Sequence, residues 1–353
     1  EGPVVGGYTD VLVPSHLQSI FETLLRKLNI SYKIQVENLA DEIEQEEMSN
    51  TRAKLKAMFR SASRSPLLET FARHSQINGW ISSLSSSCSF CSTFSIGKSY
   101  EGRDMLVLKM ATGPNKPVVF IDAGIHAREW LAPATINFVI DQLITRYNSG
   151  DQDAVNLLDK FEVQFLPVAN PDGYEYTFQA QWYRLWRKTR KPYGRCYGAD
   201  PNRNFDSQFG GPSTSNNPCS DLYHGPYAFS EPETANLRDH ITGEKRMVMY
   251  YSTHSYSQLW FIPYGYTRVP PPDNDEMVRV ATIGNNALFR THGIRFELGT
   301  PANLLYAAAG GSYDWAKEKA GVKYSYTFEL RPGRNRGGAG FIAETDMIRP
   351  SGE

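Results

Sequence analysis

The feature that most constrains the fold is an alternation of apolar, β-prone runs with helical stretches beyond residue 71. The runs predict strands over residues 105–110, 118–122, 161–168, 247–252 and 324–330, with a helix over 133–147 after the second. Strands that alternate with helices predict an α/β fold: a mixed, largely parallel twisted sheet with helices on both faces. At 353 residues, the chain has room for one large domain and a smaller unit.

The first 48 residues predict a small α+β unit of their own. Residues 11–13 look like the end of a strand, and Ser15 with Gln18 makes a capping box. Residues 32–36 alternate like a half-buried strand, and residues 41–47 form an acidic helical stretch. The helix between these strands is indicated by apolar residues at helical spacing: Leu17, Ile20, Phe21, Leu24, Leu25 and Leu28.

Residues 49–70 are polar and basic, and they include Arg60 and Arg64. This composition allows a solvated helix or linker. It equally allows a connecting segment that a trypsin-like protease cuts at an exposed basic residue. The regions on either side must decide between the two readings.

The overall charge excludes some functions. Lys+Arg 37 nearly cancels Asp+Glu 38, which gives no electrostatic reason to expect nucleic acid or an anionic membrane as partner. No apolar run approaches the roughly 20 residues of a membrane helix. The N-terminus lacks the features of a signal peptide, so a secretory signal is either removed or was never present.

The four cysteines allow three connectivities. Cys196 and Cys219 flank a loop rich in Gly, Ser, Asn and Pro, where we expect a disulfide. Cys88 and Cys91 form a C-x-x-C pair in a Ser-rich segment that we expect to be a loop. This context argues against a redox motif and is weak evidence for zinc, and their pairing stays open.

Polar residues at three strand ends point to one site, because ligands of open α/β sheets bind beyond the carboxyl ends of strands. His126 and Glu129 follow the second strand, His254 closes the strand that begins at 247, and Glu329 ends the last one. Two imidazoles and one carboxylate are the ligand set of a catalytic zinc, although other divalent ions suit the same set. Glu329 is then the candidate to take a proton from the activated water.

The segment His-Ala-Arg-Glu-Trp at 126–130 resembles the zinc-binding signature of the pancreatic-type (A/B) metallocarboxypeptidases. The similarity runs from roughly residue 71 to 350. Further matches follow in the family's order: Asn170-Pro-Asp-Gly, Arg184-Leu-Trp-Arg187-Lys, Asp200-Pro-Asn202-Arg203-Asn204, His254-Ser-Tyr-Ser-Gln, Gly310-Gly-Ser-Tyr-Asp-Trp and Phe328-Glu-Leu-Arg.

The resemblance implies roles for these residues. His126, Glu129 and His254 would hold one Zn²⁺, and Asp200 would orient a ligand imidazole. Glu329 would be the general base and Arg187 would stabilise the oxyanion.

The remaining matches imply that Asn202, Arg203 and Tyr306 hold the substrate's terminal carboxylate, with Arg184 a further substrate contact. Without the zinc signature, Arg184 and Arg187 would read as a basic face, Tyr306 as a core aromatic and Asn202 with Arg203 as a turn. In the family an acid at position 313 selects Lys and Arg. This chain has Tyr313 there, so the resemblance implies an uncharged pocket that prefers aromatic or aliphatic residues.

The resemblance also implies a domain division. Residues 1–48 would be a partial inhibitory prosegment, 49–70 a connecting segment cut near Arg60 or Arg64, and 71–353 the catalytic domain. The chain stops at Glu353, where the family's long final helix would begin, so that helix is expected to be missing. Pro201 and the loop after Glu329 also depart from the commoner family pattern.

These observations together predict the zymogen of a secreted, monomeric zinc exopeptidase. Its partners would be peptides with a free C-terminus and an activating trypsin-like protease, in the extracellular space or a digestive lumen. Two alternatives are weighed: a carboxypeptidase that processes peptide precursors, and an inactive relative that binds peptide termini. The uncharged pocket argues against the first, and the retained ligands and Glu329 argue against the second.

Overall fold

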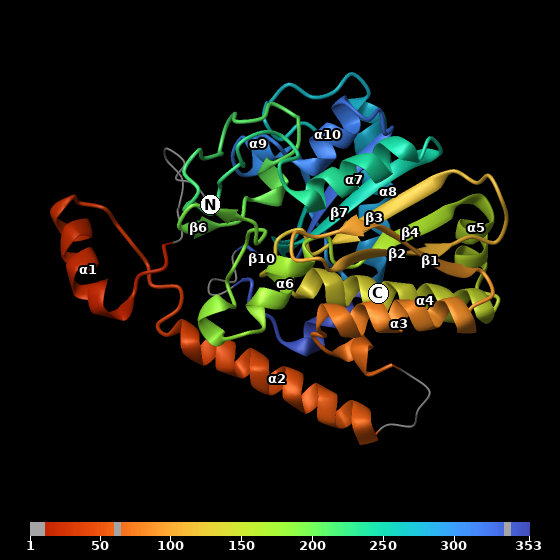
Figure 1. Ribbon diagram of the computed structural model, residues 1–353, viewed down its shortest axis with the longest axis horizontal. Helices are drawn as coiled ribbons and strands as arrows, with labels where there is room; N and C mark the ends of the chain where they lie inside the picture. Colours follow the sequence, from red (N-terminus) through yellow and green to blue (C-terminus); the bar gives the residue numbers. More distant parts are fainter. Residues whose placement is uncertain (1–10, 60–64, 335–339) are drawn as a thin grey trace.

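The computed structural model describes residues 11–59, 65–334 and 340–353, and within them an eight-stranded sheet forms the centre of the molecule (Figure 1). Its strand order is β1-β2-β4-β3-β7-β10-β8-β9, and the central strands β4, β3, β7 and β10 run parallel. The mixed, largely parallel sheet is therefore confirmed. Its strands are β1 (Cys91–Lys98), β2 (Asp104–Met110), β3 (Val118–Ala123), β4 (Glu162–Leu166), β7 (Met247–Ser257), β8 (Leu259–Phe261), β9 (Glu297–Gly299) and β10 (Tyr324–Gly333).

The strands predicted beyond residue 71 all form, but two are longer than expected. β7 continues through Ser257 and β10 through Gly333. His254 and Glu329 therefore lie within strands, not at their ends. They are also register partners across the β7–β10 pair, which places both side chains on one face of the sheet.

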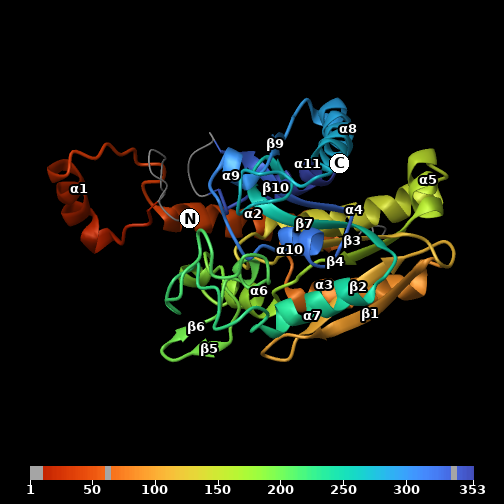
Figure 2. The same cartoon turned by 90° about the horizontal axis from the view of Figure 1, so that it is seen from above.

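Helices cover both faces of the sheet, as predicted (Figures 1 and 2). Apolar residues of α3 and α4 pack on one face, and those of α7 and α10 pack on the other. A small second sheet pairs β5 (Pro192–Tyr193) with β6 (Cys196–Tyr197). The helices of this part of the chain are α3 (His74–Ser87), α4 (Leu131–Asn148), α5 (Gln152–Lys160), α6 (Pro171–Thr177), α7 (Pro232–Gly243), α8 (Asn274–His292), α9 (Pro301–Leu304), α10 (Ser312–Glu318) and α11 (Ile348–Gly352).

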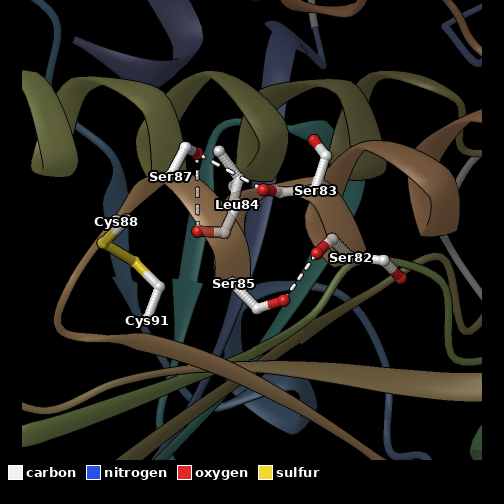
Figure 3. The surroundings of a disulfide bond; sticks show 7 residues. All are labelled: Ser82, Ser83, Leu84, Ser85, Ser87, Cys88 and Cys91. Atoms are coloured by element: carbon white, nitrogen blue, oxygen red, sulfur yellow. Dashed lines mark hydrogen bonds between the residues drawn. A yellow bond between two sulfur atoms is a disulfide. The ribbon is translucent and has the colours of Figure 1, made fainter.

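The Ser-rich segment before Cys88 is a helix, so the prediction of a loop there is wrong. Its hydroxyls donate to carbonyls three or four residues earlier, as from Ser85 to Ser82 at 2.6 Å (Figure 3). Ile77 and Ile81 on the opposite side are buried in the core and hold the helix in place. Cys88 follows α3 directly, Cys91 begins β1, and the two cysteines are joined by a disulfide.

The described residues of the N-terminal part form the α-helices α1 (Gln18–Lys27) and α2 (Leu39–Phe59) and no strand. The strands predicted over 11–13 and 32–36 are wrong, and no side chain caps α1 as the capping box required. A strand needs a neighbour to pair its backbone groups, and no neighbouring strand stands beside either segment in the described residues. The acidic helix predicted over 41–47 is confirmed, and α2 extends it.

α2 runs without a break across residues 48 and 49. The basic stretch that follows is thus helical up to Phe59. Arg60 and Arg64, near which cleavage is expected, lie outside the described residues. Among the helices of the described ranges, none combines the length and apolarity needed to cross a membrane.

Candidate active site

The candidate metal ligands come from two neighbouring strands of the sheet. His126 and Glu129 lie in the turn after β3, and His254 lies on the adjacent strand β7. All three are buried, and their ligand atoms lie within 4.8 Å of one another. The Nδ1 atoms of the two histidines are 3.1 Å apart, and each lies within 2.9 Å of one carboxylate oxygen of Glu129.

This geometry fits a zinc ion. With Zn–N bonds of about 2.0–2.1 Å, two nitrogens on one tetrahedral ion stand about 3.3 Å apart. Both buried imidazoles direct Nδ1 toward the Glu129 carboxylate. The three side chains therefore converge on one point that a cation can occupy. The side chains that the sequence singled out as ligands are therefore brought together.

A buried carboxylate supports His126 from behind. Asp200 Oδ1 lies 3.1 Å from His126 Nε2, and Asp200 Oδ2 accepts a hydrogen bond of 2.9 Å from Arg187 Nε. Because Nε2 of His126 contacts a carboxylate, the imidazole proton lies on Nε2, and Nδ1 is left to bind the metal. Asp200 thus connects the candidate metal site to the arginine expected at the oxyanion.

Charge pairing sets the pKa values of this cluster. Burial alone would raise the pKa of Glu129 and Asp200, but neighbouring cationic groups outweigh it and hold both well below their usual range. Burial likewise opposes the charge of Arg187, whose pKa Asp200 and Glu129 nevertheless raise. Burial, followed by the charge of Arg187, lowers the pKa of His126. The lowered pKa of His126 thus favours its neutral imidazole, which is the form that binds a metal.

The other predicted residues surround this cluster. Glu329 is half-buried beside His254, its register partner. Tyr306 is also half-buried, and it is close enough to Arg187 to influence that residue's pKa. Glu329 thus shares a face of the sheet with His254, and Tyr306 lies near Arg187, while the roles expected of the two residues stay predictions.

Asn202 and Arg203 are held by their local loop. Asn202 Oδ1 accepts a hydrogen bond of 2.9 Å from the backbone N–H of Ser312, which turns its amide NH₂ the other way. Arg203 donates from Nε to the carbonyl of Ser213, also at 2.9 Å. Gly310 has a φ of +73°, and a Cβ there would lie 2.3 Å from the Arg203 carbonyl, so only glycine fits. Hydrogen bonds thus fix the side chains of both residues within this loop.

The sequence analysis missed a set of polar residues behind His254. Ser252 Oγ lies 3.2 Å from His254 Nε2 and donates at 2.8 Å to the buried carboxylate of Asp122, which also accepts from Tyr250. Burial raises the pKa of Asp122 to about 6. The alternation of Tyr250, Ser252 and His254 along β7 is the signal that could have found them, since period-two residues share a face.

Comparison with known proteins decides the family. The family described as "Zinc carboxypeptidase" matches residues 77–353, which include the whole eight-stranded sheet. The chain belongs to the zinc carboxypeptidase family. Residues 1–46 match a second family, described as "Carboxypeptidase activation peptide". The protein is therefore a carboxypeptidase zymogen, and zinc is the cofactor that His126, Glu129 and His254 can hold.

Named relatives agree with this assignment. Carboxypeptidase B of Astacus astacus is 44% identical over 286 residues, which cover 79% of this chain and 91% of the relative. Zinc carboxypeptidase A 1 of Anopheles gambiae is 37% identical over 352 residues, which cover 99% of this chain and 78% of the relative. Among solved structures, carboxypeptidase A from Helicoverpa armigera has a TM-score of 0.85 at 32% identity, covering 96% of this chain and 84% of that one.

In this carboxypeptidase zymogen, Arg184 contacts the activation segment. Its guanidinium is 1% exposed and donates from Nε and Nη2 to both oxygens of Glu46 on α2, at 2.7 Å from Nη2. It also donates to the carbonyls of Arg128 and Phe341 and stacks over Trp130. Arg184, which is expected to contact substrate, is thus paired with Glu46 in this structure. The sequence did not reveal this pairing.

Tyr313, expected at the base of the carboxypeptidase pocket, is buried. A Cβ on Gly265 would lie 2.3 Å from the Tyr313 hydroxyl, so the hydroxyl packs directly against the Gly265 backbone. The neighbouring Asp314 accepts hydrogen bonds from the Gly265 N–H at 3.0 and 2.8 Å. The phenol is therefore a packed part of the protein, with its oxygen beside a buried carboxyl group.

The expected disulfide between Cys196 and Cys219 is present. It closes the loop that carries Asp200, Asn202 and Arg203. By the chain-entropy relation, a disulfide that closes a loop of this length stabilises the fold by about 3.5 kcal/mol. The bond thus restrains the segment on which the expected carboxylate-binding residues sit.

Proposed function

We propose that the activated enzyme removes single uncharged residues, aromatic or aliphatic, from the C-termini of peptides. The observation that carries the proposal is the convergence of His126, Glu129 and His254, with Glu329 as the register partner of His254. Together these residues supply a metal site and an adjacent proton acceptor. Family membership gives the reaction class, and this geometry supports the assignment of the reaction to these residues.

When bound, zinc lowers the pKa of a coordinated water and polarises a carbonyl oxygen. Glu329 accepts the proton of the attacking water on its carboxylate and then transfers it to the leaving amine. Arg187 is anchored through Nε to Asp200, and we assign its terminal nitrogens to the developing oxyanion. A contribution of about 10²–10⁴-fold in rate is expected from the general base.

Three side chains would make the enzyme an exopeptidase. Arg203 offers a guanidinium and Asn202 an amide NH₂ to the terminal carboxylate, and Tyr306 covers it. A peptide carbonyl in place of the carboxylate would leave the Arg203 charge unpaired in a buried site. Arg184 becomes available to substrate in this proposal once Glu46 leaves.

The pocket assignment rests on Tyr313. Its packed phenol supplies no charge to pair with a substrate Lys or Arg, which supports preference for apolar residues. Relatives include proteins named both carboxypeptidase A and carboxypeptidase B, so names alone do not decide the preference. Tyr313 is thus the residue to change.

We assign residues 1–48 to the prosegment, 49–70 to the connecting segment and 71–353 to the catalytic domain. Cleavage near Arg60 or Arg64 by a trypsin-like protease would free the C-terminal part, and the enzyme would act as a monomer outside the cell. The two disulfides support secretion, because such bonds persist in oxidising compartments.

The test is hydrolysis of two blocked dipeptides, one ending in Phe and one in Arg, after limited trypsin treatment. Release of Phe but not Arg is expected, with Glu329→Gln slower by about 10²–10⁴-fold. Glu297→Gln, which alters an exposed carboxylate on β9, is the matched control and should keep full activity. Tyr313→Asp should shift release toward Arg, whereas Arg release by the unaltered enzyme would overturn the pocket assignment.

A further inference from the structure

The two candidate zinc-binding histidines are supported differently. His126 Nε2 lies directly against the Asp200 carboxylate, whereas His254 Nε2 lies against the hydroxyl of Ser252. A carboxylate only accepts hydrogen bonds and so fixes where the imidazole proton sits. A hydroxyl can both donate and accept, so Ser252 alone would leave the tautomer of His254 undetermined.

The Asp122 carboxylate removes this ambiguity. Asp122 and Ser252 are register partners on β3 and β7, and both are fully buried. Ser252 Oγ lies 2.8 Å from Asp122 Oδ1, and Tyr250 donates to Oδ2 of the same carboxylate. Because the carboxylate has no hydrogen to give, the single hydroxyl hydrogen of Ser252 points to Asp122. The remaining contact of Ser252 must then be accepted from His254 Nε2–H.

We propose that Asp122 and Ser252 are positioning residues that hold His254 in the tautomer whose Nδ1 is free to bind zinc. The order of donation is His254 Nε2–H to Ser252, then Ser252 O–H to Asp122. The inference rests on the proposed role of His254 as a zinc ligand. It adds that the ligand's proton is placed by a carboxylate on the neighbouring strand, which does not touch His254 itself.

Zinc affinity of the purified zymogen, measured by competition with a chromophoric chelator, tests this inference. Outer partners of metal ligands are worth about 10–100-fold in affinity. Ser252→Ala should weaken zinc binding by about 10-fold, because the proton is no longer directed. Asp122→Ala should weaken it by about 100-fold, because the Ser252 hydroxyl can then donate to Nε2 and shift the proton to Nδ1.

Two controls separate this effect from general loosening of the core. Ser99→Ala removes another buried serine hydroxyl that donates to a buried carboxylate, that of Asp172 at 2.6 Å, away from the metal site. Tyr250→Phe removes the other donor to Asp122 but keeps the link through Ser252. Both should leave zinc affinity within about twofold, since neither interrupts the donation from His254 through Ser252 to Asp122.

Nitrogen-15 NMR of the zinc-free protein adds a readout that packing alone would not move. Wild-type His254 should carry its proton on Nε2, and Asp122→Ala should move it toward Nδ1. Equal zinc affinity in Ser252→Ala, Asp122→Ala and Ser99→Ala, with loss of binding in His254→Ala, would overturn the inference alone. Unchanged zinc binding in His254→Ala would instead overturn the proposed zinc site.

Discussion

The helices α1 and α2 both belong to the N-terminal segment, yet they relate to the enzyme in opposite ways. α1 carries the stronger apolar stripe and buries none of its residues, and it projects away from the body of the molecule (Figures 1 and 2). α2 is rich in charge and buries one narrow face. That face consists of Ile43, Glu46, Asn50 and Ala53.

The difference shows that amphipathicity predicts a helix but does not say what the helix binds. α2 is held by buried polar side chains that form hydrogen bonds with the rest of the protein. Glu46 pairs with Arg184 and accepts the Ala343 N–H, while Asn50 bonds both the N–H and the C=O of Phe71. Such contacts are specific because breaking one leaves a buried polar group unpaired.

The largest effect is expected from Glu46→Ala. It leaves the Arg184 guanidinium buried without its partner, and breaking a buried ion pair from one side costs about 3–5 kcal/mol. The free energy for opening α2, read from amide hydrogen exchange of its residues, should fall by about that amount.

Glu44→Ala is the matched control for this experiment, since Glu44 is exposed on the same helix. It should change the opening free energy by less than about 0.5 kcal/mol. Equal effects of the two substitutions would mean that the Glu46–Arg184 pair does not hold α2.

A smaller effect is expected from Asn50→Ala. The substitution removes two buried hydrogen bonds, of 2.8 and 3.0 Å, to the Phe71 backbone. Losing these partners should cost about 2–3 kcal/mol. The same hydrogen-exchange measurement checks it, and no change in α2 protection would show that water satisfies the Phe71 backbone equally well.

The smallest effect is expected on α1. Ile20 is 67% exposed, so Ile20→Ser should alter the free energy of unfolding by no more than about 0.5 kcal/mol in urea denaturation. Ile43→Ser on α2 is the matched comparison, because Ile43 is buried. A loss of more than about 1.5 kcal/mol from Ile20→Ser would mean that the stripe is covered, and the contrast between the helices would fail.

Much of this molecule could be predicted from the sequence. Apolar runs in the sequence predicted the parallel strands. The spacing of His126 and Glu129 predicted that both residues lie at the end of one strand. These signals are local, so a single segment carries each of them.

The features that escaped prediction depend on distant partners. The Glu46–Arg184 pair joins residues 138 positions apart, and the Asp122–Ser252 pair joins residues 130 apart. Nothing near either residue reveals its partner. α3 was missed for another reason, since its serines favour loops unless their hydroxyls bond back to the helix, as they do here.

The most direct test of the central claim is a zinc titration of the trypsin-activated, chelator-treated protein while release of C-terminal Phe is followed. Activity should be absent without metal and should rise linearly until one zinc per chain is added, as a single His126–Glu129–His254 site requires. Activity that persists without zinc, or that saturates at another ratio, would contradict the account.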